Sequence, residues 1–311
     1  HRFRNSNTIS CDFSKLIKNT DHSLNFMVGH EYIITKEREN MNEVHGFPED
    51  YTAEQAWKLS SQGTPYTIDD NYSADDKLLS FFGRVNYNFK DRYLLTATFR
   101  ADASSKFSEE NRWGYFPSAA VAWRISSEPF MKSTQNWLDD LKLRLSYGTA
   151  GNNNIPANQI NRVYNGSSTS WISMGNTIYT TGNVMSNPDL KWETTTTYNV
   201  GIDYGFFNDR LFGTLDVYYR ETTGLLNYTP VAAGANLTNY LTANIGSLVN
   251  KGVEFEITGI PVQTRDWNWT VGANFAYNQN RITKLTTNDG DGYKGVETGG
   301  VRGGGGGKKH R

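Results

Sequence analysis

The chain alternates apolar and polar residues over long stretches. Between Lys77 and Lys90, for example, the odd positions include Leu79 and Phe81, while Arg84 stands at an even position. A period of two residues is typical of a β-strand with one apolar face and one polar face. The pattern therefore predicts strands rather than helices for most of the chain.

Ten segments share this alternation, the first being the weakest. They are Thr8–Lys18, Ser23–Thr35, Lys77–Lys90, Tyr93–Asp102, Trp113–Ile125, Asp140–Tyr147, Trp192–Tyr204, Leu211–Thr222, Gly252–Thr258 and Trp267–Asn278. Many of them are about twice as long as the mean globular strand of about 5 to 6 residues. A tilted strand needs roughly 9 to 11 residues to cross a bilayer. The lengths therefore favour membrane-spanning strands.

The connections between these segments alternate in length. Short links at 19–22, 91–92 and 207–209 follow the first, third and seventh segments, moderate links at 126–139 and 259–266 follow the fifth and ninth, and longer links at 38–76, 103–112, 148–191 and 223–251 follow the others. Outer-membrane barrels have short periplasmic turns at one end and longer extracellular loops at the other. The loop lengths therefore favour a barrel over a soluble sandwich.

Aromatic residues gather near both ends of the predicted strands. Near the short turns they are Phe89, Tyr93, Trp123, Phe206, Phe207 and Trp267, and near the long loops they are Tyr32, Trp113, Tyr115, Tyr147, Trp192, Tyr219 and Tyr277. Membrane barrels carry aromatic girdles at both interfaces. Aromatic residues also favour strands in general, but their presence at both ends favours girdles.

Composition narrows the class of protein further. Aromatic residues make up 14% of the 311 residues and glycine accounts for 29 of them, which suits β-structure with turns. With 31 basic and 32 acidic residues, the chain lacks the basic surplus of nucleic-acid-binding proteins. The single Cys11 excludes an internal disulfide framework. No apolar run is long enough for a transmembrane helix, but barrel strands also lack such runs.

Several short sequence motifs point to a family. They are Phe81–Tyr87, Lys90–Leu95, Phe99–Phe107, Arg112–Ser118, Leu141–Gly148 with Gly151–Asn152, Asn187–Glu193 and Asn250–Glu254. In their order and spacing over about residues 75 to 285, these motifs resemble the barrel of SusC/RagA TonB-linked outer-membrane transporters. The chain departs from the family pattern at Ala103, where glycine is common, and at Ala150, where threonine is expected.

The resemblance implies a 22-stranded parent barrel in the outer membrane of a Gram-negative bacterium. It also implies an N-terminal plug, energy supplied through TonB, and a SusD-like surface lipoprotein as a lid. The chain shows neither a signal peptide nor a plug, and it ends in the glycine-rich run 303–307 before Lys308. We therefore expect an internal fragment, with a partial barrel at 1–285 and a glycine-rich loop or truncated end at 286–311.

The fold prediction is all-β: an antiparallel transmembrane β-barrel fragment of about ten long strands. Because diameter and stagger are fixed together by strand number, ten strands of a wider barrel are not expected to close. We expect an open, curved sheet with unpaired first and last strands. The apolar face would contact lipid and the polar face the lumen.

Signatures of an enzyme are lacking in the sequence. It has no glycine-rich phosphate loop, no Gly-x-Ser-x-Gly elbow and no His-Glu-x-x-His motif. Adjacent carboxylates such as Asp69 and Asp70 fall in loops, where solvated turns are expected. We therefore expect no enzyme activity, no catalytic residues, no metal site and no cofactor.

Candidate substrate-facing residues fall into two sets. The charged set on the polar face is Arg84, Arg100, Asp102, Arg144, Asp216, Arg220, Glu254 and Glu256; the aromatic set in the long loops is Trp57, Tyr66, Tyr164 and Trp171. The charged set would line the lumen as a wall seen by substrate and plug, but pairing between strands is the favoured explanation. The aromatic set would stack on sugar rings or contact the lid, or else pack within its own loops.

The predicted function is TonB-energised import of a nutrient such as an oligosaccharide or peptide, with the bilayer, TonB and a SusD-like lipoprotein as partners. A passive porin or adhesin barrel would lack the plug. A soluble carbohydrate-binding β-sandwich would bury its Leu and Phe faces between two sheets. Nucleic acid is not an expected partner.

Overall fold

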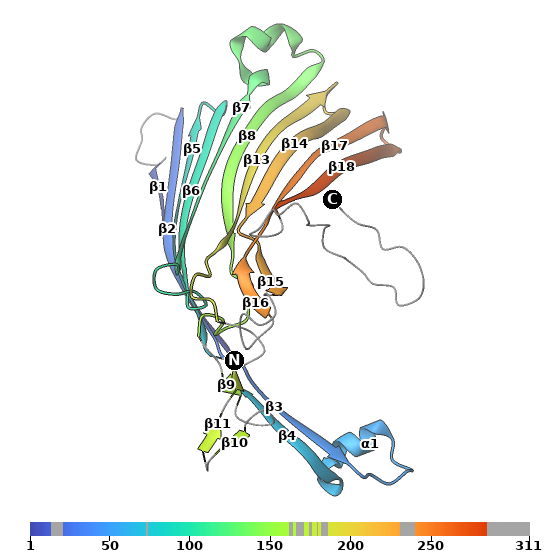
Figure 1. Cartoon of the computed structure of the whole chain (residues 1–311). Helices are drawn as coiled ribbons and strands as arrows, with labels where there is room; N and C mark the ends of the chain where they lie inside the picture. Colours follow the sequence, from blue (N-terminus) through green and yellow to red (C-terminus); the bar gives the residue numbers. More distant parts are fainter. Residues whose placement is uncertain are drawn as a thin grey trace, which may run out of the picture.

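One ten-stranded antiparallel sheet dominates the computed structural model (Figure 1). Its order is β1 (Arg2–Asp12), β2 (His22–Thr35), β5 (Asp76–Phe89), β6 (Tyr93–Ser104), β7 (Trp113–Arg124), β8 (Leu138–Asn152), β13 (Glu193–Phe206), β14 (Leu211–Thr223), β17 (Ser247–Gln263) and β18 (Asn268–Lys284). The structure describes residues 1–13, 21–72, 74–161, 164–165, 171–173, 176–178, 180–181, 186–230 and 240–284. No described helix is long and apolar enough to cross a membrane.

The sheet is open, as expected. β1 and β18 are its edges, and each pairs with one neighbour in the sheet. Figure 1 shows a curved wall rather than a closed barrel. Nor does a second sheet pack over this wall in the described part of the chain, which leaves the sandwich alternative without support. The residues 286–311 lie outside the described residues.

The ten predicted strands are all present, with corrections to their limits. The largest correction is at the start, where β1 spans Arg2–Asp12 instead of Thr8–Lys18. Its alternation is weak because Asn5 and Asn7 share a face with Phe3 and Ile9. β8 also extends beyond its predicted segment, through the glycine and threonine positions of 148–152. β17 extends at both ends, where shifts in its register with β18 interrupt the alternation.

Register places the apolar side chains in rows across the sheet. One row runs through nine strands from β2 to β18: Leu24, Tyr87, Leu95, Val121, Leu145, Val200, Val217, Val253 and Tyr277. Val121, Val200 and Val217 are each nearly half exposed. Within the described structure this face is uncovered, as a lipid-facing surface requires.

The short turns explain how β5 joins β6 and β13 joins β14. Lys90 and Asp91 both have positive φ, of 55° and 52°. Paired positive φ values are the geometry of the type I′ turn, whose twist matches that of the strands it joins. Phe207, Asn208 and Asp209 have positive φ in the second turn. The turns lie at what we call the short-turn end of the sheet.

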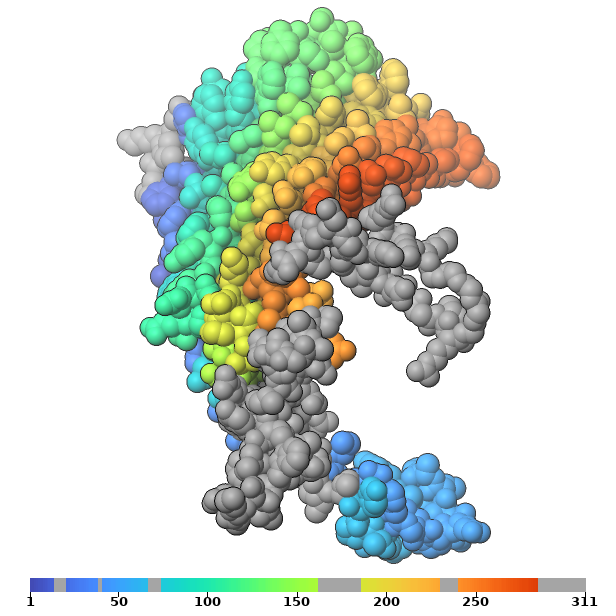
Figure 2. All heavy atoms as spheres, viewed as in Figure 1, coloured from blue at the N-terminus to red at the C-terminus, as the bar shows by residue number. Residues whose placement is uncertain are grey.

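The opposite, long-loop end carries small elements that the alternation did not predict. The hairpin β3 (Arg38–His45) and β4 (Thr64–Tyr72) projects away from the sheet and carries α1 (Ala53–Lys58) (Figures 1 and 2). The hairpin β15 (Leu226–Pro230) and β16 (Tyr240–Asn244) and the short pairs β9 (Tyr164–Asn165) with β12 (Thr180–Thr181) and β10 (Trp171–Ser173) with β11 (Asn176–Ile178) also lie there. The 3-10 turns are η2 (Ser60–Gln62) here and η3 (Ile125–Ser127) and η4 (Pro129–Thr134) between β7 and β8.

A small hydrophobic core joins the long loops. Phe107, Ile155 and Leu190 are buried together, and Trp192 packs against them. Trp192 also donates from Nε1 to the carbonyl of Arg112 at 2.9 Å. Its assignment to the outer aromatic girdle was therefore wrong, because the chain turns inward at the residue before β13.

Candidate functional site

The polar face of the sheet is the candidate site, and register places the eight predicted charged residues on it. They occupy alternate positions of β5, β6, β8, β14 and β17, opposite to the apolar row. Two clusters of ion pairs form on this face. Both link neighbouring strands, and both include residues that the sequence alone did not single out.

The first cluster surrounds Arg100 of β6. Its Nε donates to both carboxylate oxygens of Asp102 at 2.8 Å, and its Nη2 donates to Ser80 Oγ at 2.9 Å. Nη2 also lies 3.5 Å from Glu31 Oε2 on β2. Arg4 of β1 binds the same Glu31. The cluster thus ties four strands together with two buried carboxylates.

The second cluster surrounds Arg144 of β8. Its Nε donates to Asp203 Oδ1 of β13 at 2.8 Å and its Nη2 to Asp216 Oδ2 of β14 at 2.9 Å. Lys142 Nζ adds a second ion pair to Asp203, at 2.6 Å. Charge-assisted hydrogen bonds of this kind fix side chains in place. Arg144 and Asp216 were both predicted, whereas Asp203 and Lys142 were missed.

Four predicted charges stand outside these clusters. Arg84, Arg220, Glu254 and Glu256 make no ion pair with another described residue. Glu254 lies directly opposite Asp216, and Glu256 lies two residues further along β17. With Asp203 there are four carboxylates here against three cations, Lys142, Arg144 and Arg220, so the wall at β8, β13, β14 and β17 has a small acidic excess.

The missed residues followed the same alternation as the predicted ones. Glu31 occupies the polar face of β2, and Asp203 occupies the polar face of β13. Only the register of the sheet shows their partners, because Glu31 pairs with Arg100 and Asp203 pairs with Arg144, each on a strand distant in sequence. A pattern within one strand does not reveal which strand lies next to it.

The structure describes the side chains of two of the four predicted aromatic residues. Trp57 lies on α1 with 80% of its surface exposed, and Tyr66 lies on β4 with 66% exposed. Tyr66 stacks on His45 with ring centroids 4.4 Å apart. Tyr164 and Trp171 begin β9 and β10, but their side chains lie outside the described residues.

The aromatic bands at the two ends of the sheet are confirmed apart from Trp192. Tyr93 stacks between Phe89 and Trp123 at the short-turn end. Tyr198 contacts Tyr147 and Tyr219 toward the long-loop end. No group of His, Cys, Asp and Glu residues suited to a metal ion is found within the described part of the chain.

Comparison with known proteins agrees with this architecture. The TonB dependent receptor-like, beta-barrel family matches residues 2–302. The TonB-dependent receptor SusC of Bacteroides thetaiotaomicron is 44% identical over 230 residues, which are 71% of this chain and 22% of that protein. The TonB-dependent receptor P26 of Formosa agariphila is 39% identical over 209 residues, 67% of this chain and 21% of that protein.

Solved structures give the same result. The RagAB peptide transporter matches with a TM-score of 0.77 and 31% identity, covering 92% of this chain and 30% of the other. The siderophore receptor PirA of Pseudomonas aeruginosa shares the fold at a TM-score of 0.55 and 15% identity, covering 91% of this chain and 43% of the other. The chain spans about a fifth of the length of its curated relatives. It belongs to the TonB-dependent receptor-like β-barrel family, and within it to the SusC/RagA group of outer-membrane proteins.

Proposed function

We propose that this chain forms part of the barrel wall of a TonB-energised importer that carries an oligosaccharide or a peptide across the outer membrane. The observation that supports this most directly is the opposed chemistry of the two faces. An uncovered apolar row crosses nine strands, and the reverse face carries ion pairs between strands. Membrane barrels have this arrangement, with lipid outside and a polar lumen inside.

The clusters around Arg100 and Arg144 would hold the wall rigid. Their carboxylates are occupied by cations of the same or a neighbouring strand, which leaves them few free acceptors for a ligand. Glu254 and Glu256 would instead meet the plug or the substrate. This division favours a structural role for most of the charged set and a contact role for the two glutamates.

The relatives support two classes of substrate. The RagAB neighbour is described as a peptide transporter, and the resemblance to SusC/RagA proteins also admits oligosaccharides. An acidic wall would favour cationic peptides, because opposite charges raise local concentration in a low-dielectric channel. An oligosaccharide, being neutral, would be insensitive to Glu254 and Glu256.

Uptake in living cells tests the proposal. Cells carrying the complete transporter should take up labelled peptide or oligosaccharide only when TonB is present. Equal uptake with and without TonB would favour the passive porin alternative. With a lysine-rich peptide, E254Q combined with E256Q should lower uptake, whereas a neutral peptide should be unaffected.

The lid is a further part of the proposal. The hairpin β3–β4 with α1 extends from the long-loop end and exposes Trp57 and Tyr66 (Figures 1 and 2). Exposed aromatic residues are enriched where proteins bind one another. We infer that this hairpin contacts a SusD-like surface lipoprotein.

A further inference from the structure

The outward face of β13, β14, β17 and β18 distributes its charges unevenly. Among the described residues, the charges that alternation places on this face are Glu221, Lys251 and Arg281. All three lie toward the long-loop end. Two cations face one carboxylate, and the described residues form no ion pair with Lys251 or Arg281.

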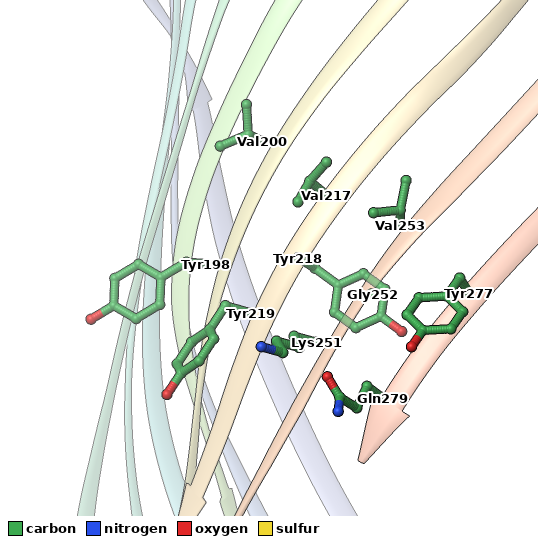
Figure 3. A pocket seen from close by; sticks show the side chains of 10 residues that line it. All are labelled: Tyr198, Val200, Val217, Tyr218, Tyr219, Lys251, Gly252, Val253, Tyr277 and Gln279. Atoms are coloured by element: carbon green, nitrogen blue, oxygen red, sulfur yellow. The ribbon is translucent and has the colours of Figure 1, made fainter. Parts of the chain in front are cut away.

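Lys251 belongs to a polar row across the four strands. Tyr198, Tyr219, Lys251 and Gln279 stand opposite one another in register. Figure 3 shows these four side chains at one level of the sheet. Arg281 is the diagonal neighbour of Lys251, two residues beyond Gln279 on β18. The row and Arg281 together therefore carry two hydroxyls, an amide and two cations.

An apolar groove begins next to this row, on the side toward the short-turn end. Val200, Val217 and Val253 form its floor, and Tyr277 lies at its side (Figure 3). The groove has a volume of about 390 Å³. Two residues along a strand correspond to about 7 Å. Val253 thus lies about 7 Å from Lys251 along β17, and about twice that distance from the level of Arg281, which pairs with Val249.

We propose that this face binds a phosphorylated lipid of the outer leaflet, with its phosphate at Lys251 and Arg281 and an acyl chain along the valine groove. Basic residues at the membrane surface attract anionic lipid headgroups. Tyrosines at the same level suit the interface, because one end of the ring is apolar and the other polar. The charge surplus makes an anionic lipid the matching occupant rather than a neutral lipid or a second copy of the chain.

The inference rests on the proposed orientation, in which the long-loop end is extracellular, but it concerns a separate site. Import is proposed for the polar face, and lipid binding for the opposite face. Uptake and lipid binding are therefore independent measurements. Loss of TonB-dependent uptake with normal lipid binding would contradict only the proposed import.

Lipid binding by the complete transporter in mild detergent provides the test. Monophosphoryl lipid A is added as the probe and bound lipid is counted by native mass spectrometry. K251Q combined with R281Q should weaken binding about thirtyfold. The matched control is R265Q in the turn at the opposite end of β17, which should leave binding unchanged.

Further measurements separate a lipid site from a bare anion site. V217T places a hydroxyl in the acyl groove and should therefore weaken binding of the lipid. The variant transporter should still be recovered in detergent micelles like the native protein. Removing the phosphate from the lipid should weaken its binding to the native protein. The loss should equal the loss that K251Q/R281Q causes with the phosphorylated lipid. Unchanged binding in K251Q/R281Q, equal binding of the dephosphorylated lipid, or equally tight binding of inorganic phosphate would each overturn the proposal.

Discussion

Arg144 reaches across a complete strand to bind Asp216. Its Nη2 donates to Asp216 Oδ2 at 2.9 Å, although β13 lies between their strands β8 and β14. The residue of β13 at the crossing point is Gly201, which is opposite both of them in register. A side chain on Gly201 would occupy the space that the guanidinium fills. The ion pair therefore depends on a residue that takes no part in it.

Replacing Gly201 with alanine should break this crossing. The added Cβ would lie 2.6 Å from Arg144 Nη2 and 2.5 Å from Asp216 Oδ1, so the ends of these two side chains would have to move apart. Loss of a hydrogen bond between charged groups costs about 1.5–3 kcal/mol. We expect a lower unfolding temperature of the transporter in detergent. Gly83→Ala is the control, since its Cβ would meet nothing closer than 3.7 Å; equal losses from both variants would contradict the role of Gly201.

A charge on the outward face should be tolerated far less than one on the inward face. Val217 lies at the middle of β14 and faces outward, whereas Thr214 on the same strand faces inward between Asp203 and Glu256. Val217→Arg should cost about 2–4 kcal/mol at the bilayer midplane. Thr214→Arg should cost little, because its new cation meets two carboxylates. Denaturant unfolding in lipid vesicles measures both, and equal penalties would contradict the orientation of the sheet.

Glu128 should make stability depend on pH at the short-turn end. Hydrogen bonds from Tyr93 Oη at 2.6 Å and Trp123 Nε1 at 3.0 Å lower the pKa of this carboxyl, with Arg92 contributing as a nearby cation. A lowered pKa means that the stabilisation is complete above the ordinary glutamate pKa of about 4.3 and is lost as the pH falls through the folded value.

The measurement for Glu128 is the unfolding midpoint of the transporter between neutral and strongly acidic pH. The E128Q variant should be less stable than the native protein at neutral pH, and the difference should shrink on acidification. Fluorescence of Trp123 would report the local change. A difference that stays constant with pH would show that the carboxylate charge is unimportant.

Removing the exposed aromatic residues of the β3–β4 hairpin should separate lid binding from barrel assembly. Trp57→Ala with Tyr66→Ala removes two side chains that bury little surface in this chain. Insertion into the outer membrane should persist, while the amount of SusD-like lipoprotein recovered with the transporter should fall. Lys58→Ala, which removes a neighbouring exposed side chain without an aromatic ring, is the control. Undiminished recovery with the aromatic variant would contradict the proposed contact.

The sequence allowed prediction of what depends on residues near one another in the chain. Alternation located the ten long strands, because each strand must be apolar on one face and polar on the other. It also placed Arg144 and Asp216 on the same face. It failed for β1, whose mixed face lacks a clear period, and for α1. A capping box between Thr52 and Gln55 could have revealed that helix.

Contacts that depend on which strands are neighbours could not be predicted from alternation within each strand. The partners of Arg100 lie on β2 and β5 as well as on its own strand. Trp192 illustrates the same limit, because its spacing fits the outer face while the loop core draws it inward. The open sheet, in contrast, was predictable from strand number, since about ten strands cannot close with the stagger of a wider barrel.

The apolar row has a geometric consequence for the whole wall. At the short-turn end, the row lies two residues from the end of β2 (Leu24 to His22) but ten residues from the end of β17 (Val253 to Gln263). At the long-loop end, the corresponding distance falls from eleven residues on β2 to six on β17. The row thus climbs by about one residue per strand, which with the usual strand rise and spacing inclines the strands by about 35°. Because each pairing sets its own share of this inclination, added strands would widen the barrel without changing its pitch.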